Sequence, residues 1–146
     1  MERIHATSVA LNGNAVLLRG GPGSGKSDLA LRLIDEGWDL VSDDYTELHM
    51  VDGQLCARAP ENIQGLIEVR GLGIMRIGCL PRARVAAVFD LLPLSEIERL
   101  PDAATETLLG QDVPRFQLHG FDASAPAKVR LALKAHAENL FHNARA

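Results

Sequence analysis

Eight consecutive residues near the start of the chain have the types and spacing of a phosphate-binding loop. They fill the pattern G-x-x-x-x-G-K-[ST] without a mismatch and are Gly20, Gly21, Pro22, Gly23, Ser24, Gly25, Lys26 and Ser27. Glycines let successive backbone N–H groups turn toward an anion, and the helix that begins near Lys26 would point its positive dipole end at the same place. We expect Lys26 to reach the β- and γ-phosphates of a bound nucleotide and Ser27 to hold Mg²⁺ through its hydroxyl. A glycine-rich turn with a purely structural purpose is the alternative interpretation.

The segments on either side of this loop have the periodicity that the motif requires. Residues 15–18 are apolar and predict a strand, and residues 28–34 carry apolar side chains at helical spacing. The helix should end near Glu36, with Gly37 as its C-terminal cap. The loop is therefore predicted to lie between a strand and a helix, where its N–H groups can face a phosphate.

Two adjacent carboxylates, Asp43 and Asp44, follow the next predicted strand, residues 38–41. An acidic residue at a strand end supports Mg²⁺ or its bound water in enzymes with such a loop. One carboxylate would assist the metal, and the other would take a proton from a hydroxyl nucleophile. A polar turn, for which Ser-Asp-Asp is also a suitable composition, is the alternative.

Glu68 and Arg70 lie two residues apart on a predicted strand, residues 66–70. Residues at this spacing share one face of a strand, so a simple ion pair is one interpretation. Gly71 and Gly73 follow at once and would allow the backbone to approach a ligand or partner closely, which is the other interpretation.

The remaining pattern predicts an α/β fold with a mixed sheet in one domain, residues 1–146. Tight turns are expected at 12–14 and 51–54, because Asn-Gly and Asp-Gly favour hairpins, and hairpins argue against a fully parallel sheet. Further strands are expected at 9–11, 45–50, 55–59, 85–92 and 113–118. Residues 93–107 are polar and punctuated by proline, which indicates a surface loop. A last helix is expected over 125–144, with Val129, Leu131, Leu133, Leu140 and Phe141 as its apolar side.

Composition argues against several classes of function. The formal net charge of −4 and an aromatic content of 4% give neither the basic surface nor the stacking residues that nucleic-acid binding needs. Cys56 and Cys79 match no metal or redox spacing, which favours two reduced thiols. The N-terminus lacks the features of a signal peptide, and no apolar run reaches the ~18 residues of a membrane span. We therefore expect a cytoplasmic protein without a membrane partner.

The order of these motifs resembles the catalytic domain of the HPr kinase/phosphorylase family. Residues 67–74, Ile-Glu-Val-Arg-Gly-Leu-Gly-Ile, look like that family's signature stretch E-[IV]-R-G-x-G-I. The phosphate loop, the Asp43–Asp44 pair and this stretch occur in the family's order with close to its spacing. His5 lies 21 residues before Lys26, which matches a functional histidine of the family. The resemblance covers roughly residues 4–118.

The resemblance implies a fold, an activity and a set of partners. The fold would be a mixed sheet of the phosphoenolpyruvate-carboxykinase type. The activity would be ATP- and Mg²⁺-dependent phosphorylation of a serine on an HPr-type phosphocarrier protein of the phosphotransferase system, with phosphorolysis as the reverse reaction. Assembly into a homo-oligomer would also follow.

The same resemblance implies a role for each site residue. Lys26 would contact the phosphates, and Ser27 and Glu68 would be metal ligands. Asp44 would accept the proton of the serine hydroxyl, with Asp43 supporting it. By the same resemblance, His5 would lie near the phosphates and Arg115 would be a catalytic arginine near the end of the domain.

Several departures from the family's usual pattern are present. The chain resembles the truncated, catalytic-domain-only form found in α-proteobacteria. Asp28 stands where the family usually has Glu, and Pro22 removes one N–H from the loop. The C-terminal region is shortened, so kinase activity is better supported than phosphorolysis. Two other functions stay open: a small-molecule P-loop kinase, whose arginine-rich lid is not evident in residues 71–84, and a regulatory nucleotide-binding switch.

Overall fold

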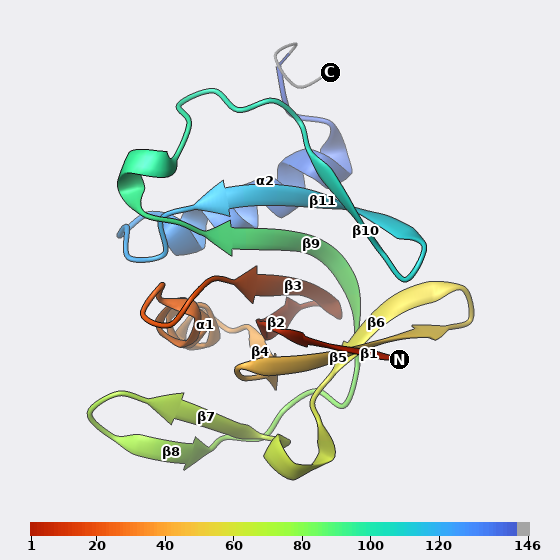
Figure 1. The fold of residues 1–146 in the computed structure, drawn as a ribbon, viewed down its shortest axis with the longest axis vertical. Helices are drawn as coiled ribbons and strands as arrows, with labels where there is room; N and C mark the ends of the chain where they lie inside the picture. Colours follow the sequence, from red (N-terminus) through yellow and green to blue (C-terminus); the bar gives the residue numbers. More distant parts are fainter. Residues whose placement is uncertain (143–146) are drawn as a thin grey trace.

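A nine-stranded mixed sheet forms the body of the protein, and a two-stranded hairpin stands beside it (Figure 1). The computed structural model describes residues 1–142. The strands of the main sheet are β1 (Glu2–His5), β2 (Thr7–Leu11), β3 (Asn14–Arg19), β4 (Asp39–Ser42), β5 (Tyr45–Val51), β6 (Gln54–Arg58), β9 (Ala83–Leu91), β10 (Thr105–Leu108) and β11 (Gln111–Leu118). The hairpin, helices and single helical turns are β7 (Leu66–Val69), β8 (Gly73–Arg76), α1 (Lys26–Asp35), α2 (Ala125–Glu138), η1 (Glu61–Ile63) and η2 (Leu94–Glu96).

The strand that leads into the phosphate loop, β3, lies inside the sheet. The order is β1-β5-β6-β9-β3-β2-β4, with β11 paired to β9 and β10 paired to β11. Strand β9 is parallel to β3 and to β11, whereas the other pairs are antiparallel. The predicted mixed sheet is thus confirmed. Because β3, β9 and β11 are parallel, their carboxyl ends meet at one edge of the sheet, where ligands of α/β proteins bind.

Two of the predicted turns are confirmed as tight hairpins. Asn12 and Gly13 join β2 to β3 with φ of 53° and 78°, and Asp52 and Gly53 join β5 to β6 with φ of 50° and 78°. Two successive residues at positive φ match the twist of the flanking strands, which favours Asn-Gly and Asp-Gly here. The first hairpin fixes the register of β3 and so the place where the phosphate loop begins.

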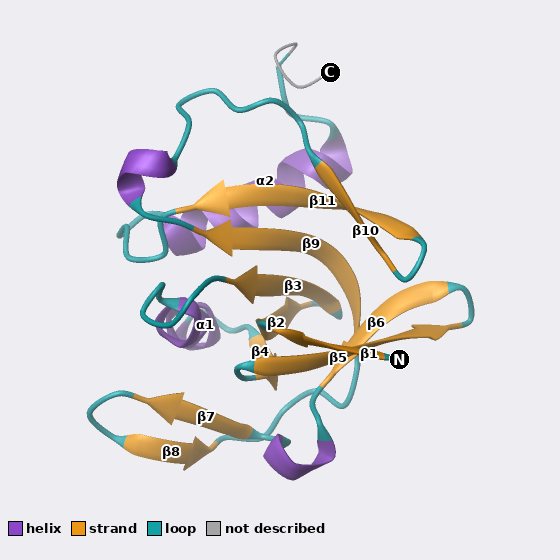
Figure 2. Ribbon diagram, viewed as in Figure 1, coloured by secondary structure: helices purple, strands orange, loops and turns teal. Residues whose placement is uncertain are grey.

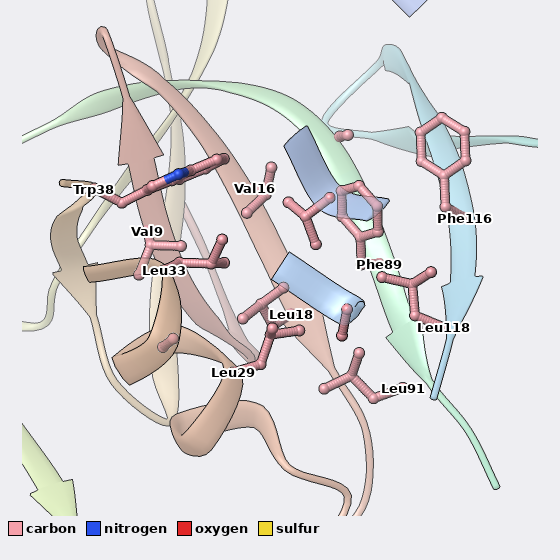
Figure 3. Packing of buried hydrophobic residues seen from close by; sticks show 14 of the residues in the cluster. Val9, Val16, Leu18, Leu29, Leu33, Trp38, Phe89, Leu91, Phe116 and Leu118 are labelled. Carbon is pink, nitrogen blue, oxygen red and sulfur yellow. The ribbon is translucent and has the colours of Figure 1, made fainter. Parts of the chain in front are cut away.

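Both helices pack on one face of the sheet and bury one apolar cluster against it (Figure 2). Leu29 and Leu33 of α1 and Val129 of α2 are fully buried there. The residues of this cluster labelled in Figure 3 are Val9, Val16, Leu18, Leu29, Leu33, Trp38, Phe89, Leu91, Phe116 and Leu118. Truncating such a leucine to alanine costs about 2–5 kcal/mol, so this contact holds α1 firmly at the end of β3. Within residues 1–142, no helix is long and apolar enough to cross a membrane.

The opposite face of the curved sheet buries a second cluster of smaller side chains. Leu17 and Val88 point to this side, whereas their neighbours Leu18 and Phe89 point to the helices. The alternation follows from the period of two along a strand. Strand β9 therefore has apolar side chains on both faces over much of its length, as its continuous apolar run predicted.

Three strands were not predicted, and one helix was predicted too long. Strands β1, β8 and β10 are short and lack a run of apolar residues. The expected helix over 125–144 ends at Glu138, because Asn139 takes a left-handed conformation (φ 54°) that caps it. Positions 143 and 144 lie outside the described residues. Leu131 and Leu140 were also predicted on its apolar side but are more than half exposed.

Candidate active site

The phosphate loop joins β3 to α1 and holds Lys26 across its own backbone. Gly23 and Gly25 have φ of 80° and 97°, a conformation that only glycine adopts without strain. The Lys26 ammonium donates to the carbonyl oxygen of Gly20 at 2.7 Å and lies 3.3 Å from that of Gly21. Lys26 is 8% exposed. Within residues 1–142 no carboxylate pairs with Lys26, so its charge is held over the loop and is available to an anion.

Asp43 joins three segments that are far apart in the chain. Its Oδ1 accepts hydrogen bonds from the hydroxyl groups of Ser27, at 2.6 Å, and Thr7, at 3.1 Å. Its Oδ2 accepts one from the backbone N–H of Glu68, at 3.0 Å. Asp43 is 8% exposed. A buried carboxylate beside the loop hydroxyl is in the right place to support a metal ion or its water.

Asp44 has the opposite environment. Its backbone is left-handed, with φ of 67°, so its side chain leaves the alternation of the strand and is more than half exposed. The N–H of Asp44 donates to the Thr7 hydroxyl at 3.0 Å, which fixes this turn. Its Oδ1 lies 2.7 Å from Nε2 of His5, and its Oδ2 accepts no hydrogen bond within residues 1–142. Asp44 therefore offers a free carboxylate oxygen at the mouth of the site.

His5 reaches Asp44 because β1 pairs with β5. His5 lies opposite Tyr45 in that ladder, and the two rings stack with centroids 5.1 Å apart. The stacking fixes the orientation of the imidazole and leaves Nε2 directed at Asp44. The structure thus brings His5 to Asp44, while its expected place near the phosphates stays a prediction.

Glu68 lies on β7 at the wall of a cleft of about 400 Å³. Asp43, Asp44 and Glu68 are its carboxylates, and Ile63, Leu66 and Ile74 are among its apolar walls. A second cavity of about 610 Å³ opens at the other end of the strands and holds no predicted site residue. The lining of the cleft is thus mixed, with carboxylates beside apolar side chains.

The oxygen donors Ser27 and Glu68 fit magnesium, although they do not form a complete set of protein ligands. Among residues 1–142, no group of three or more His, Cys, Asp and Glu side chains is arranged to hold a metal ion by itself. Mg²⁺ is commonly bound by one or two protein ligands together with the phosphates and water. Ser27, supported by Asp43, and Glu68 would supply such a partial set.

Within residues 1–142, neither of the two predicted arginines pairs with Asp43, Asp44 or Glu68. Arg70 is exposed in the turn after β7. Arg115 donates to Asp90 at 2.6 Å and lies 3.9 Å from Glu106. Both acids also bind Arg19, which directly precedes the loop. Arg115 therefore belongs to an ion-pair network at the base of the loop.

This network was missed by the sequence analysis, and its charges are strongly coupled. The hydrogen bond from Arg19 holds the pKa of the Glu106 carboxyl below its usual value, against the effect of partial burial. The same bond raises the pKa of Arg19. Nothing in the local sequence links positions so far apart. Thr7 was also missed, because the predicted strand covered only residues 9–11 and Thr7 is followed by a second polar residue, Ser8.

Taken together, the fold and site are those of an α/β protein in which a loop with the phosphate-binding sequence pattern lies beside an acidic pair. The family model described as "HPr Serine kinase C-terminal domain" matches residues 1–82, which is more than half of the chain. The chain belongs to this family. The matched span includes the loop, both aspartates, Glu68 and Arg70, whereas Arg115 lies beyond it.

Individual relatives agree with this assignment. The HPr kinase/phosphorylase of Clostridium beijerinckii is 44% identical over 78 residues, which cover 53% of this chain and 26% of that protein. The HPr kinase/phosphorylase of Chlorobium phaeobacteroides is 35% identical over 130 residues, which cover 80% of this chain and 40% of that protein. The chain thus spans well under half the length of these curated relatives.

A solved structure is similar over nearly the whole chain. It is the Hpr(Ser) kinase/phosphatase from Coxiella burnetii, at 27% identity and a TM-score of 0.84. The match covers 96% of this chain and 93% of that chain. The resemblance suggested by the signature stretch is therefore confirmed for the fold and the family.

Proposed function

We propose that this protein is an ATP-dependent protein-serine kinase that phosphorylates an HPr-type phosphocarrier protein. The observation that carries the proposal is the exposed Asp44 carboxylate, held by His5 at 2.7 Å and one residue from the Asp43 that binds Ser27. A proton acceptor thus lies next to a phosphate loop and open to a protein surface. The names of the relatives support the choice of substrate.

Each residue has a distinct part in this reaction. Lys26 would bind and neutralise the phosphates, and Ser27 and Glu68 would hold the magnesium ion. ATP bound with this ion would supply the phosphoryl group. Asp43 holds the Ser27 hydroxyl in place. Asp44 accepts the proton of the substrate serine through Oδ2, while Oδ1 stays bonded to His5.

The reverse reaction would use the same carboxyl group. By microscopic reversibility, a protonated Asp44 returns its proton to the serine oxygen when phosphoserine is cleaved by phosphate. Arg115 and Arg70 are proposed to act on the phosphates and on the protein substrate, respectively. We place the enzyme in the cytoplasm and expect it to form a homo-oligomer.

The test is incubation of the protein with labelled ATP, Mg²⁺ and a panel of purified phosphocarriers. Mass spectrometry then maps the modified residue. The proposal predicts label on one serine of a phosphocarrier, and loss of that label on addition of excess phosphate if phosphorolysis is retained. Label on a metabolite, with every phosphocarrier unmodified, would instead identify a small-molecule kinase.

A further inference from the structure

The loop after β11 lies directly against the phosphate loop. A Cβ placed on Gly120 would come within 2.8 Å of the Ser24 carbonyl oxygen, and one placed on Gly25 would meet the ring of Phe121 at 3.2 Å. Both glycines therefore permit a contact that no larger residue allows. Gly25 has a second reason to be glycine, since its φ is 97°. The Phe121 ring thus rests on the backbone of the phosphate loop.

This loop is anchored at several points. The Arg32 guanidinium of α1 donates to the carbonyl oxygens of Gly120 and, at 3.0 Å, of Asp122. A ring nitrogen of His119, Nδ1, lies 3.0 Å from the carbonyl oxygen of Leu92. Helix α1 and the end of β9 therefore hold the segment at both of its sides. Phe121 is presented from a rigid backbone.

The Phe121 side chain is nevertheless more than half exposed. It is 55% exposed, and its ring meets that of His119 edge-on with centroids 6.0 Å apart. An aromatic ring that is fixed beneath and open above offers a flat apolar surface to a ligand. Its position beside the phosphate loop suggests which ligand that is.

The two flanks of the phosphate loop have different chemistry. Asp43 and the cleft carboxylates lie toward β4, on one side of β3. Phe121 follows β11, which lies on the other side of β3 beyond β9. A nucleotide whose terminal phosphates lie at Lys26 and Ser27 has its base at the opposite end. The base would therefore lie on the side of β3 away from the carboxylates, where Phe121 follows β11.

We propose that Phe121, supported by His119, is the platform on which the nucleotide base stacks. The proposal rests on the proposed function, because it assumes a nucleotide in the phosphate loop. Stacking accepts any base, since each has a π-face. The platform therefore distinguishes phosphate donors that carry a base from those that do not, and it discriminates little among bases.

The experiment compares two ligands that differ in the nucleoside. Calorimetry with Mg²⁺ measures the dissociation constants of ADP and of pyrophosphate for the wild type, Phe121→Ala and Phe121→Tyr. We expect Phe121→Ala to weaken ADP binding by on the order of tenfold and to leave pyrophosphate binding unchanged. Phe121→Tyr keeps a ring and should retain ADP binding. Leu131→Ala, a similarly exposed residue on α2, is the control and should change neither constant.

Each contrary result has a separate meaning. Equal weakening of ADP and pyrophosphate by Phe121→Ala would overturn the proposal, because the ring would then only support the phosphate loop. Unchanged binding of both ligands would also overturn it. If the well-folded wild type bound neither ligand, the proposed function would fail together with the platform. Binding of both ligands with no effect of Phe121 would reject the platform alone.

Discussion

At the scale of single residues, the site depends on two neighbouring aspartates with opposite environments. Asp43 is buried and accepts three hydrogen bonds, whereas the Asp44 side chain is turned outward by its positive φ and bonds to His5 alone among residues 1–142. A carboxylate that already accepts three bonds is poorly placed to take a proton in a reaction. The exposed Asp44 keeps one oxygen available, so we assign the two roles accordingly.

We expect Asp44→Asn to reduce serine phosphorylation by about 10²–10⁴-fold while nucleotide binding is retained. The amide keeps the size of the side chain but cannot accept the proton. Turnover and ADP affinity should be measured on the same preparation. Asp52→Asn is the matched control, since Asp52 is also exposed at positive φ, in the turn between β5 and β6.

A comparable loss of turnover and of ADP affinity would place Asp44 in nucleotide or metal binding instead. If Asp43→Asn were the more damaging change to the proton-transfer step, the two roles would be reversed. The structural contacts of Asp43 predict that its substitution also lowers thermal stability, which separates the two variants.

At the scale of elements, the β7–β8 hairpin connects the site to the surface. Its signature residues, 67–74, lie on β7, in the turn and at the start of β8, and Leu72 and Ile74 are more than two thirds exposed. Glu68 faces the cleft, whereas Arg70 is exposed. The simple Glu68–Arg70 ion pair considered from the sequence does not form within the described residues, 1–142. Arg70 is therefore available to a partner.

We expect Arg70→Ala to lower kcat/KM for the phosphocarrier by roughly tenfold, because a charged hydrogen bond to a carboxylate or phosphate is lost. The affinity for ADP should not change. Arg76→Ala is the control, since Arg76 is exposed on the same hairpin. If Arg70→Ala and Arg76→Ala lowered kcat/KM equally, Arg70 would contribute only as one of several surface charges and not as a specific contact. Gly71→Ala is a less specific test, because an alanine at the φ of 91° that Gly71 adopts would strain the backbone of the turn.

The elements also show what the sequence could and could not predict. The loop, α1 and the tight hairpins were predicted because their signals are local: a motif, helical spacing and Asn-Gly or Asp-Gly turns. Strand β1 was missed because it is an edge strand whose pairing partner, β5, is distant in sequence. Strand β10 pairs with the next strand, β11, but was missed because its four residues are mostly polar and directly follow a polar segment punctuated by proline. The acidic pair was predicted, but the contacts that give Asp43 and Asp44 different environments were not. They involve Thr7 and Glu68, which are distant in sequence and are brought to Asp43 only by the fold.

At the scale of the whole molecule, one ion-pair network joins four strands. Arg19 of β3, Asp90 of β9, Glu106 of β10 and Arg115 of β11 are connected by hydrogen bonds or ion pairs. Each acid is only partly buried. The network fixes the unpredicted strand β10 to the base of the phosphate loop, so its charge state should affect the stability of the whole domain.

Glu106→Gln should lower the free energy of unfolding at neutral pH. The free energy of unfolding of this variant should also fall less steeply than that of the wild type as the pH is lowered. The pKa of Glu106 is lower in the folded protein than its ordinary value of 4.5, chiefly through Arg19. Its contribution is therefore complete above about pH 4.5 and is lost as the pH falls through the folded pKa. Urea denaturation at a series of pH values measures this. Glu98→Gln, at an exposed carboxylate, is the control, and an equal pH profile for both variants would contradict the assignment.

The enzyme should phosphorylate a folded phosphocarrier far better than a short peptide copied around its serine. Contacts remote from the serine position the hydroxyl in line with the phosphate, and a peptide loses most of them while it must also be ordered. The measurement is kcat/KM for both substrates at the same ATP and Mg²⁺ concentrations. Equal values would indicate a small, local recognition site.

The hydrogen bond from the Glu68 amide to Asp43 gives the site a thermodynamic link to local unfolding. A two-stranded hairpin is marginally stable by itself, and β7–β8 belongs to no larger sheet. When it opens, the Asp43 carboxylate loses one of its three donors, and Glu68 leaves the cleft. The fraction of molecules competent for reaction is then set by the opening equilibrium of the hairpin. A partner that covers β7–β8 would raise this fraction without touching the reacting atoms, and slower hydrogen exchange at the Glu68 amide would report it.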